Sequence, residues 1–120
     1  MKIIIPIEPV TKKNHSQVVM IKGRPIVLPS KPYQEYEKKC KQYMPNIETI
    51  NYPINLECHF YKGTHRKCDI TNLLQAVCDI LVKYKVIGDD NYSIVASVDG
   101  TIVNYDKENP RTEIYITKKN

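Results

Sequence analysis

An amphipathic helix predicted over residues 70–85 constrains the fold of this chain more than any other feature. At about 100° per residue, one of its faces carries Leu73, Leu74, Val77, Ile80, Leu81 and Tyr84. The opposite side carries Asn72, Gln75, Ala76, Asp79 and Lys83. A helix with one apolar face needs a second layer to cover that face, so the rest of the chain must supply a sheet or further helices.

Patterns typical of strands occur on both sides of this helix. They predict strands at 2–8, 54–62, 93–99 and 111–117 and a hairpin of 17–21 with 25–28. A second, charged helix is predicted over 31–44, because Ser30 can cap it and Pro32 suits its first turn. These elements predict an α+β fold, with two helices and a small sheet that is mixed or mostly antiparallel.

The length of 120 residues fits a single domain covering residues 1–120. With 42% hydrophobic residues the core is modest, and domains of this size often gain stability by pairing with a second copy. No apolar run approaches the roughly 20 residues of a membrane helix. The opening MKIIIPIEPV is too short for a secretory signal and is interpreted as the first strand. We therefore expect a cytoplasmic protein without a membrane anchor.

The four cysteines are widely spaced, at Cys40, Cys58, Cys68 and Cys78. They form no C-x-x-C pair and have no histidine cluster beside them, so we expect reduced core residues in a reducing cytosol. The scattered histidines suggest no catalytic triad, and the serines have no nucleophile-elbow glycines around them. With four glycines in the chain, no glycine-rich phosphate loop is present either.

The net charge of +5 is unevenly distributed. Residues 1–67 carry 12 Lys and Arg against 5 Asp and Glu, whereas residues 68–99 carry 2 against 5. A basic body around an acidic segment fits a polyanionic partner such as nucleic acid, although a pI near 9 is also common among small proteins. The residues that could bind a phosphate backbone are Lys12, Lys13, Asn14, Arg66 and Lys67, with ordinary surface charge as the alternative.

Four aspartates could bind a metal ion. Asp69 precedes the predicted helix, Asp79 lies within it, and Asp89-Asp90 follows it. Carboxylates are ligands that hard cations such as Mg²⁺ prefer, and positive charge nearby suits a phosphodiester substrate.

Each of these aspartates also has a structural explanation. Asp69 is a favoured helix N-cap, with Asn72 in the position of a capping partner. Asp79 can pair with Lys83 one turn later, the explanation we prefer for it. The Asp-Asp pair after Gly88 can be a solvated turn, and the sequence does not establish that the aspartates meet.

At these residues the chain resembles the RusA family of Holliday-junction resolvases, small phage-derived endodeoxyribonucleases. The family pattern has Asp, one residue, a second Asp, Asn-Leu, a Lys shortly after, a helix Asp and an Asp-Asp pair. The matching string here is DITNLLQAVCDIL followed by VIGDD. The opening IPIEPVTKKNHS is also similar, so the resemblance covers most of the chain.

The resemblance implies that Asp69 and Asp90 are metal-binding carboxylates, with help from Asp89 or Asp79. It also places Asn72 in the Asn-Leu step, as a further DNA-binding candidate. Thr71 stands where the second carboxylate is expected, and Gln75 stands where the functional lysine is expected. Thr binds a metal only weakly, through a neutral oxygen, and Gln cannot stabilise developing negative charge as Lys does.

Three functions remain open. The first, which we favour because the acidic spacing is kept, is a Mg²⁺-dependent endonuclease (Mn²⁺ can replace Mg²⁺) that acts as a homodimer on four-way junctions in DNA recombination and repair. Its catalytic residues would be Asp69, Asp90, Thr71 and Gln75. The alternative, favoured by Thr71 and Gln75, is a catalytically impaired protein that binds branched DNA. An interaction protein with no nucleic-acid role is a weaker third hypothesis.

Overall fold

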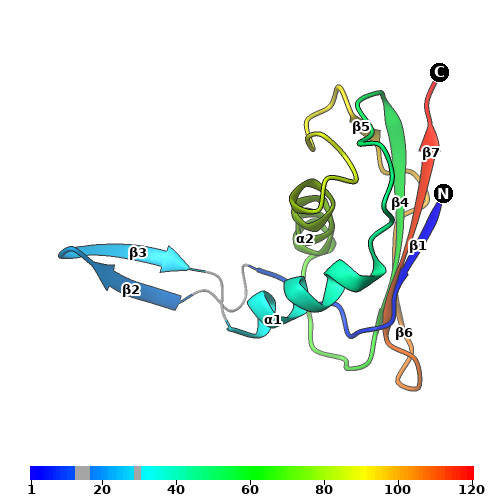
Figure 1. Cartoon of the computed structure of the whole chain (residues 1–120). Helices are drawn as coiled ribbons and strands as arrows, with labels where there is room; N and C mark the ends of the chain where they lie inside the picture. Colours follow the sequence, from blue (N-terminus) through cyan, green and yellow to red (C-terminus); the bar gives the residue numbers. More distant parts are fainter. Residues whose placement is uncertain (13–16, 29–30) are drawn as a thin grey trace.

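The computed structural model describes residues 1–12, 17–28 and 31–120. The fold is α+β, as predicted, with a mixed sheet and two α-helices (Figure 1). In chain order its elements are β1 (Lys2–Ile5), β2 (Gln17–Ile21), β3 (Arg24–Leu28), α1 (Lys31–Cys40), the 3₁₀ turn η2 (Lys41–Tyr43), β4 (Ile54–Lys62), α2 (Ile70–Lys83), β5 (Val95–Ser97), β6 (Ile102–Tyr105) and β7 (Arg111–Lys118).

Strand β4 is the centre of the main sheet. On one side it pairs antiparallel with β7, which in turn pairs antiparallel with β1. On its other side it pairs parallel with β5 at its start and with β6 at its end. The sheet is therefore mixed. Because parallel neighbours need a crossover connection, α2 must carry the chain back from the end of β4 to its beginning.

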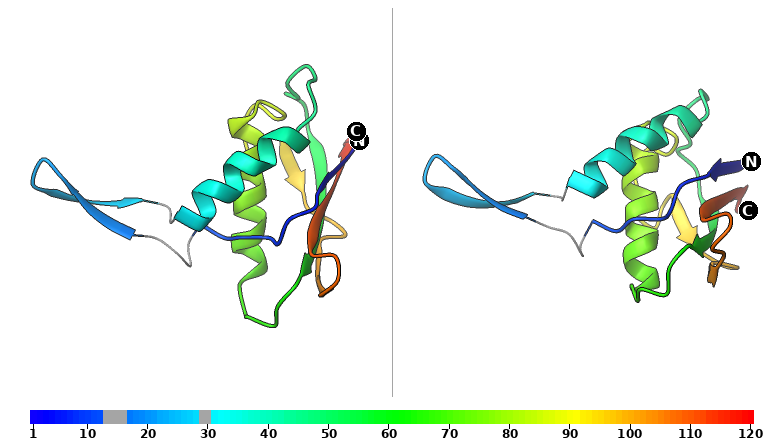
Figure 2. Two further views of the ribbon diagram at one scale, coloured as in Figure 1. Left: turned by 60° about the horizontal axis from the view of Figure 1, so that its bottom comes forward. Right: turned by 90° about the horizontal axis from the view of Figure 1, so that it is seen from below.

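Both helices cover one face of this sheet (Figures 1 and 2). Strand β4 alternates buried and half-buried residues, and Ile54, Leu56, Cys58 and Phe60 point into the core with at most 1% of their surface exposed. Burying each large apolar side chain contributes about 1.5–3 kcal/mol. The core cluster joins these residues to the apolar face of α2 and to Tyr36 and Cys40 of α1.

The predicted polar side of α2 is wrong at one position. Ala76 is 3% exposed, because α2 has neighbours on more than one side. The hydroxyl of Tyr84 donates a hydrogen bond to the carbonyl oxygen of Glu37 in α1, and the side chain of Gln75 reaches the loop after α2.

Helix α1 begins at Lys31 as expected but becomes a 3₁₀ turn after Cys40. Its helical region ends at Met44, whose ψ of 135° is extended, since Pro45 follows and disfavours helical geometry in the preceding residue. The predicted cap, Ser30, lies outside the described residues.

Helix α2 ends at Lys83, earlier than the predicted Lys85. Lys85 adopts a left-handed conformation with φ of 60°. The N–H of Val86 donates to the carbonyl of Leu81 (2.9 Å) and the N–H of Lys85 donates to that of Val82 (3.1 Å). This pair of bonds is a Schellman motif, and Leu81 and Val86 are both fully buried, which supplies its hydrophobic contact.

The predicted strands are all present, and β2 and β4 have the predicted bounds. Strand β1 stops at Ile5, since Pro6 has no N–H to continue the ladder, and the strand predicted over 93–99 is reduced to β5. Strand β6 was missed. Its four residues are all exposed, so the sequence shows no inward-outward alternation there.

Strands β2 and β3 form the predicted hairpin, which extends away from the main sheet (Figure 1). Lys22 and Gly23 both have positive φ, at 51° and 75°, as a two-residue type I′ turn requires.

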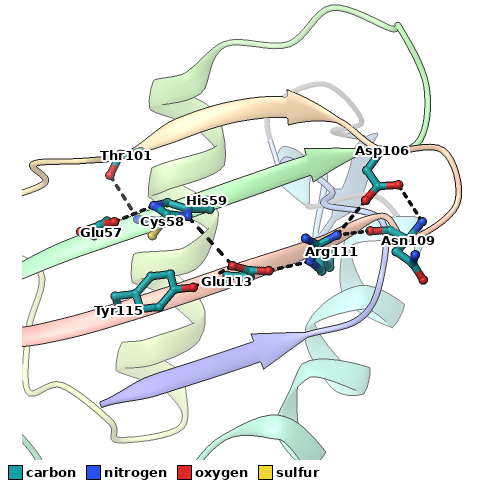
Figure 3. A network of polar contacts seen from close by, with 9 residues as sticks. All are labelled: Glu57, Cys58, His59, Thr101, Asp106, Asn109, Arg111, Glu113 and Tyr115. Carbon is teal, nitrogen blue, oxygen red and sulfur yellow. Dashed lines mark hydrogen bonds and ion pairs between the residues drawn. The ribbon is translucent and has the colours of Figure 1, made fainter.

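The face of the sheet away from the helices carries a polar network (Figure 3). His59 lies 2.6 Å from Glu57 and 4.0 Å from Glu113. Arg111 donates to Glu113 (2.7 Å) and to Asp106 (2.9 Å), and these bonds hold the pKa of both carboxyl groups below its usual range. Alternation of apolar and polar residues in β4 and β7 thus gives the sheet one core face and one polar face.

Three of the four cysteines are buried as predicted, whereas Cys68 is half-buried, and all four are free thiols. In the described ranges, no helix is long and apolar enough to span a membrane.

The turn that connects β5 to β6 should depend on its glycine. Gly100 has φ of +88°, and a Cβ atom there would lie 2.7 Å from Cδ of Glu57. Gly23 has a similar φ of +75° but no atom within 4 Å of such a Cβ. We expect Gly100→Ala to lower the free energy of unfolding by about 2 kcal/mol and Gly23→Ala by about 1 kcal/mol, measured by urea denaturation. Equal losses would show that contact with Glu57 does not matter.

Candidate functional site

The start of α2 places the carboxylate of Asp69 at the surface. Asp69 occupies the N-cap position with extended backbone angles, and its carbonyl oxygen accepts the N–H of Asn72 (3.1 Å) and of Leu73 (3.2 Å). Its side chain, however, makes no capping hydrogen bond. The predicted cap is therefore wrong for the carboxylate, whose only hydrogen bond in the described structure is a 3.5 Å contact from the amide of Asn72.

The C-terminal end of α2 determines where Asp90 lies. After the Schellman motif, Val86 and Ile87 are buried, and Ile87 forms a parallel bridge with Ile50. The N–H of Gly88 donates to the carbonyl of Ile50 (3.0 Å). These contacts fix the loop against the body, so that Asp90 returns beside the middle of α2.

Gln75 joins two of the predicted metal-binding carboxylates. Its Nε2 donates to Oδ1 of Asp79 at 2.9 Å and to Oδ2 of Asp90 at 3.2 Å. The amide lies where the resemblance expects a lysine, so a neutral donor holds two anionic groups together. The Nζ of Lys12 is 3.4 Å from Oδ2 of Asp79, and this surface pair contributes at most about 1 kcal/mol.

The predicted ion pair of Asp79 with Lys83 is wrong. Lys83 pairs instead with Glu37 of α1, which raises the pKa of the lysine. One open hollow along α2 is lined by both ion pairs and by Asp90. Its charged residues are Lys12, Glu37, Asp79, Lys83 and Asp90. Glu37 was missed by the sequence analysis, since only the packing of α1 on α2 brings it there.

Asp89 stabilises its own loop. Its carboxylate accepts the N–H of Asp90 at 2.7 Å and the side-chain amide of Asn91 at 3.0 Å. These bonds hold its pKa below the usual value, chiefly through the backbone N–H of Asp90. The turn interpretation thus describes Asp89 well, while Asp90 points its own carboxylate to Gln75.

The structure gathers the candidate metal ligands only in part. Asp79 and Asp90 share Gln75, but no hydrogen bond or ion pair within the described ranges links Asp69 to Asp90. Thr71 is exposed in the first turn of α2. Among residues 1–12, 17–28 and 31–120, no three His, Cys, Asp or Glu side chains form a metal-binding group.

Cys78 lies inside the helix beside these carboxylates. Burial raises the pKa of its thiol to about 12, and the negative charges of Asp90 and Asp79 add to this shift. The thiol therefore stays protonated at neutral pH and does not supply a thiolate ligand.

Two of the basic candidate residues lie shortly before the start of α2. Arg66 and Lys67 lie in the loop from β4 to α2 and line a hollow with Lys62, Glu8 and residues 9–11. Lys62 is partly neutralised by Glu8 at 3.2 Å. Two further candidates for DNA binding, Lys13 and Asn14, lie outside the described residues.

Comparison with known proteins identifies the family of the chain. The family model of the endodeoxyribonuclease RusA matches residues 6–117 of the chain. No curated protein matches it. The family match includes β4, α2, the loop carrying Asp90 and the last strand, and therefore nearly the whole fold. The chain belongs to the RusA family of endodeoxyribonucleases.

Proposed function

We propose that this protein is a Mg²⁺-dependent endodeoxyribonuclease that resolves four-way DNA junctions by cutting two phosphodiester bonds. The family match over residues 6–117 carries the proposal, because this family implies junction-resolving endonucleases. The pair of carboxylates held by Gln75 supports it, since acidic groups beside the cation of Lys12 suit metal-assisted phosphodiester cleavage.

The donor groups present fit a hard cation such as Mg²⁺, with Mn²⁺ as a substitute. Asp79 and Asp90 bring two negative charges to one neutral amide, and Lys12 alone among the described cations pairs with them. Asp69 and Asp90 would hold the metal, with Asp79 beside Asp90. Mg²⁺ commonly uses one or two carboxylates and completes its shell with water and substrate phosphate, so three protein ligands are not required.

The bound metal would supply charge neutralisation at the scissile phosphate and an activated water. The protein's own residues have simpler roles. Gln75 orients Asp79 and Asp90, while Asp89 holds the turn that presents Asp90. Lys12, Arg66 and Lys67 would contact phosphates, which makes DNA affinity fall steeply with salt.

A second function has a specific observation in its favour. Gln75 and Thr71 are neutral where the resemblance expects charge, so the site lacks one cation and one carboxylate. A protein of this fold could bind branched DNA and not cut it. Binding of the junction in chelator, with no cleavage in Mg²⁺ or Mn²⁺, would establish this function.

We also propose that the protein is a cytosolic homodimer. Cleavage at two symmetry-related strands matches C₂ symmetry, and the four free thiols fit a reducing compartment. The β2–β3 hairpin is the best-supported interface with the second copy. It exposes Ile21 (46%) and Ile26 (38%) on one face, and a two-stranded hairpin alone is marginally stable in water.

Asp90→Asn should remove most of the cleavage activity. The amide oxygen of Asn can still accept the Gln75 hydrogen bond, so the loop keeps its place, but the negative charge is lost. We expect the single-turnover rate on a synthetic four-way junction in Mg²⁺ to fall by roughly 100-fold or more. Asp99→Asn, in the exposed turn after β5, is the matched control and should cleave normally. An Asp90→Asn variant that cuts at the wild-type rate would refute the site.

Gln75→Lys should raise the cleavage rate, because an ammonium group can reach both carboxylates and adds the missing charge. We expect an increase of about tenfold in the rate constant at saturating junction. Gln75→Met is the control, since methionine is also unbranched and favours helices but carries no charge. If both variants have the same rate, charge at this position does not limit catalysis.

Replacing Ile21 and Ile26 together by Ser should convert the dimer to a monomer. The change removes apolar surface from one hairpin face and leaves the core untouched. Analytical ultracentrifugation at micromolar concentration measures the outcome, with Val98→Ser, also an exposed apolar residue (39%), as the control. A double variant that remains dimeric would exclude the hairpin as the interface.

A further inference from the structure

An open pocket of about 370 Å³ lies where β6 meets the loop from β4 to α2. The end of β4 contributes Lys62, and β6 contributes Val103, Asn104 and Tyr105. The loop contributes Thr64, His65, Arg66, Lys67 and Cys68. No acidic residue lines this pocket, although three basic ones do. Such a lining favours an anionic ligand.

The pocket contains an exposed aromatic platform. The rings of His65 and Tyr105 are stacked, with centroids 3.9 Å apart and planes inclined by 21°. Tyr105 keeps 47% of its surface exposed, and His65 is exposed as well. The platform depends on the parallel pairing of β4 with β6, which places Tyr105 opposite Lys62 at the point where the loop begins.

Two of the three cations beside this platform are not neutralised. Lys62 pairs with Glu8 and Lys12 pairs with Asp79, but Arg66 and Lys67 form no ion pair within the part of the chain that the structure describes. Both are exposed. A flat aromatic surface next to two free cations has the composition of a site for one nucleotide, in which the base stacks and the phosphate is held by charge.

The pocket adjoins a second hollow that leads toward the start of α2. The two hollows share five lining residues, and the second hollow also includes Val10 and Thr11. The shared residues are Lys62, Thr64, Arg66, Lys67 and Cys68. Asp69 follows Lys67 by two residues. A DNA strand bound in this pocket would therefore pass close to the start of α2.

We propose that this pocket binds a single unstacked nucleotide of a DNA strand, with its base on the His65–Tyr105 platform and its phosphates at Arg66 and Lys67. A base inside a duplex has both faces covered, whereas a base at a branch point or in a single strand has a free face. The pocket would thus make the protein select branched over linear DNA. This inference rests on the proposed function only in taking DNA as the ligand.

The test measures binding in chelator, so that cleavage plays no part. The probe is a four-way junction with 2-aminopurine at the branch point, together with a short single strand carrying the same base. Stacking on the platform should quench the fluorescence of 2-aminopurine when the wild-type protein binds. Tyr105→Ala should weaken binding of both probes about tenfold and remove the quenching, whereas Tyr105→Phe should keep both.

A matched control is available in Tyr52. It is also exposed (37%) and lies under the ammonium of Lys118 (4.8 Å), outside the residues that line the pocket. Tyr52→Ala should bind and quench like the wild type. Arg66→Gln with Lys67→Gln should reduce the slope of log affinity against log salt by about one or more, since two phosphate contacts are lost.

Unchanged affinity and quenching in Tyr105→Ala would overturn the proposal. If circular dichroism shows that this variant is unfolded, His65→Ala, in the loop, decides by the same criteria. Failure of the nuclease proposal can be distinguished from failure of the pocket proposal. If the wild-type protein cleaves no junction in any metal but still quenches 2-aminopurine, the nuclease proposal is refuted and the pocket proposal stands. Absence of any DNA binding by the wild type refutes both.

Discussion

The parallel pairing of β4 with β5 and β6 is the constraint on which the rest of the structure depends. Antiparallel strands can be joined by a short turn, but a parallel partner requires the chain to cross the sheet. Helix α2 makes this crossing, and its apolar face, with Leu73, Val77 and Leu81, covers the core side of β4. The same crossing brings the loop at 63–69 to one end of α2 and the loop at 84–94 to the other. Both loops carry candidate functional residues at exposed positions, Asp69 in the first and Asp90 in the second.

The geometry of the acidic group follows from how α2 ends. A left-handed residue and a Schellman motif stop the helix, and the buried pair Val86 and Ile87 then anchors the returning chain. With the loop fixed at these points, Asp90 returns alongside the helix it has just left, and Gln75 spans the gap to Asp79. The carboxylates are thus held by backbone structure on one side and by an amide on the other. Such support limits the side-chain entropy that would be lost on binding a cation.

The sequence predicted the elements that have strong periodicity and missed those that depend on contacts between distant segments. Alternation in residues 54–62 and the 3.6-residue pattern of α2 were sufficient, since each reports burial on one face. Strand β6 has four exposed residues and no such pattern; only its pairing with β4 defines it. The partner of Lys83 was mistaken for the same reason. The i, i+4 spacing predicts Asp79 as the partner of Lys83, but the lysine pairs with Glu37 of α1. Positions along one helix are predictable from spacing, whereas ion pairs between helices require the packing.

Compared with a lysine, Gln75 changes the charge of the site but keeps its hydrogen bonds. A lysine there would supply donors to Asp79 and Asp90 and would also cancel one of their charges. The amide keeps both hydrogen bonds, so the carboxylates remain side by side with only Lys12 nearby to offset them. Two like charges held together in this way attract a divalent cation more strongly than a charge-compensated pair does. The substitution therefore separates two properties of the site. It favours binding of the cation and weakens stabilisation of negative charge that develops during cleavage, so metal affinity and catalytic rate are expected to change in opposite directions when the lysine is restored.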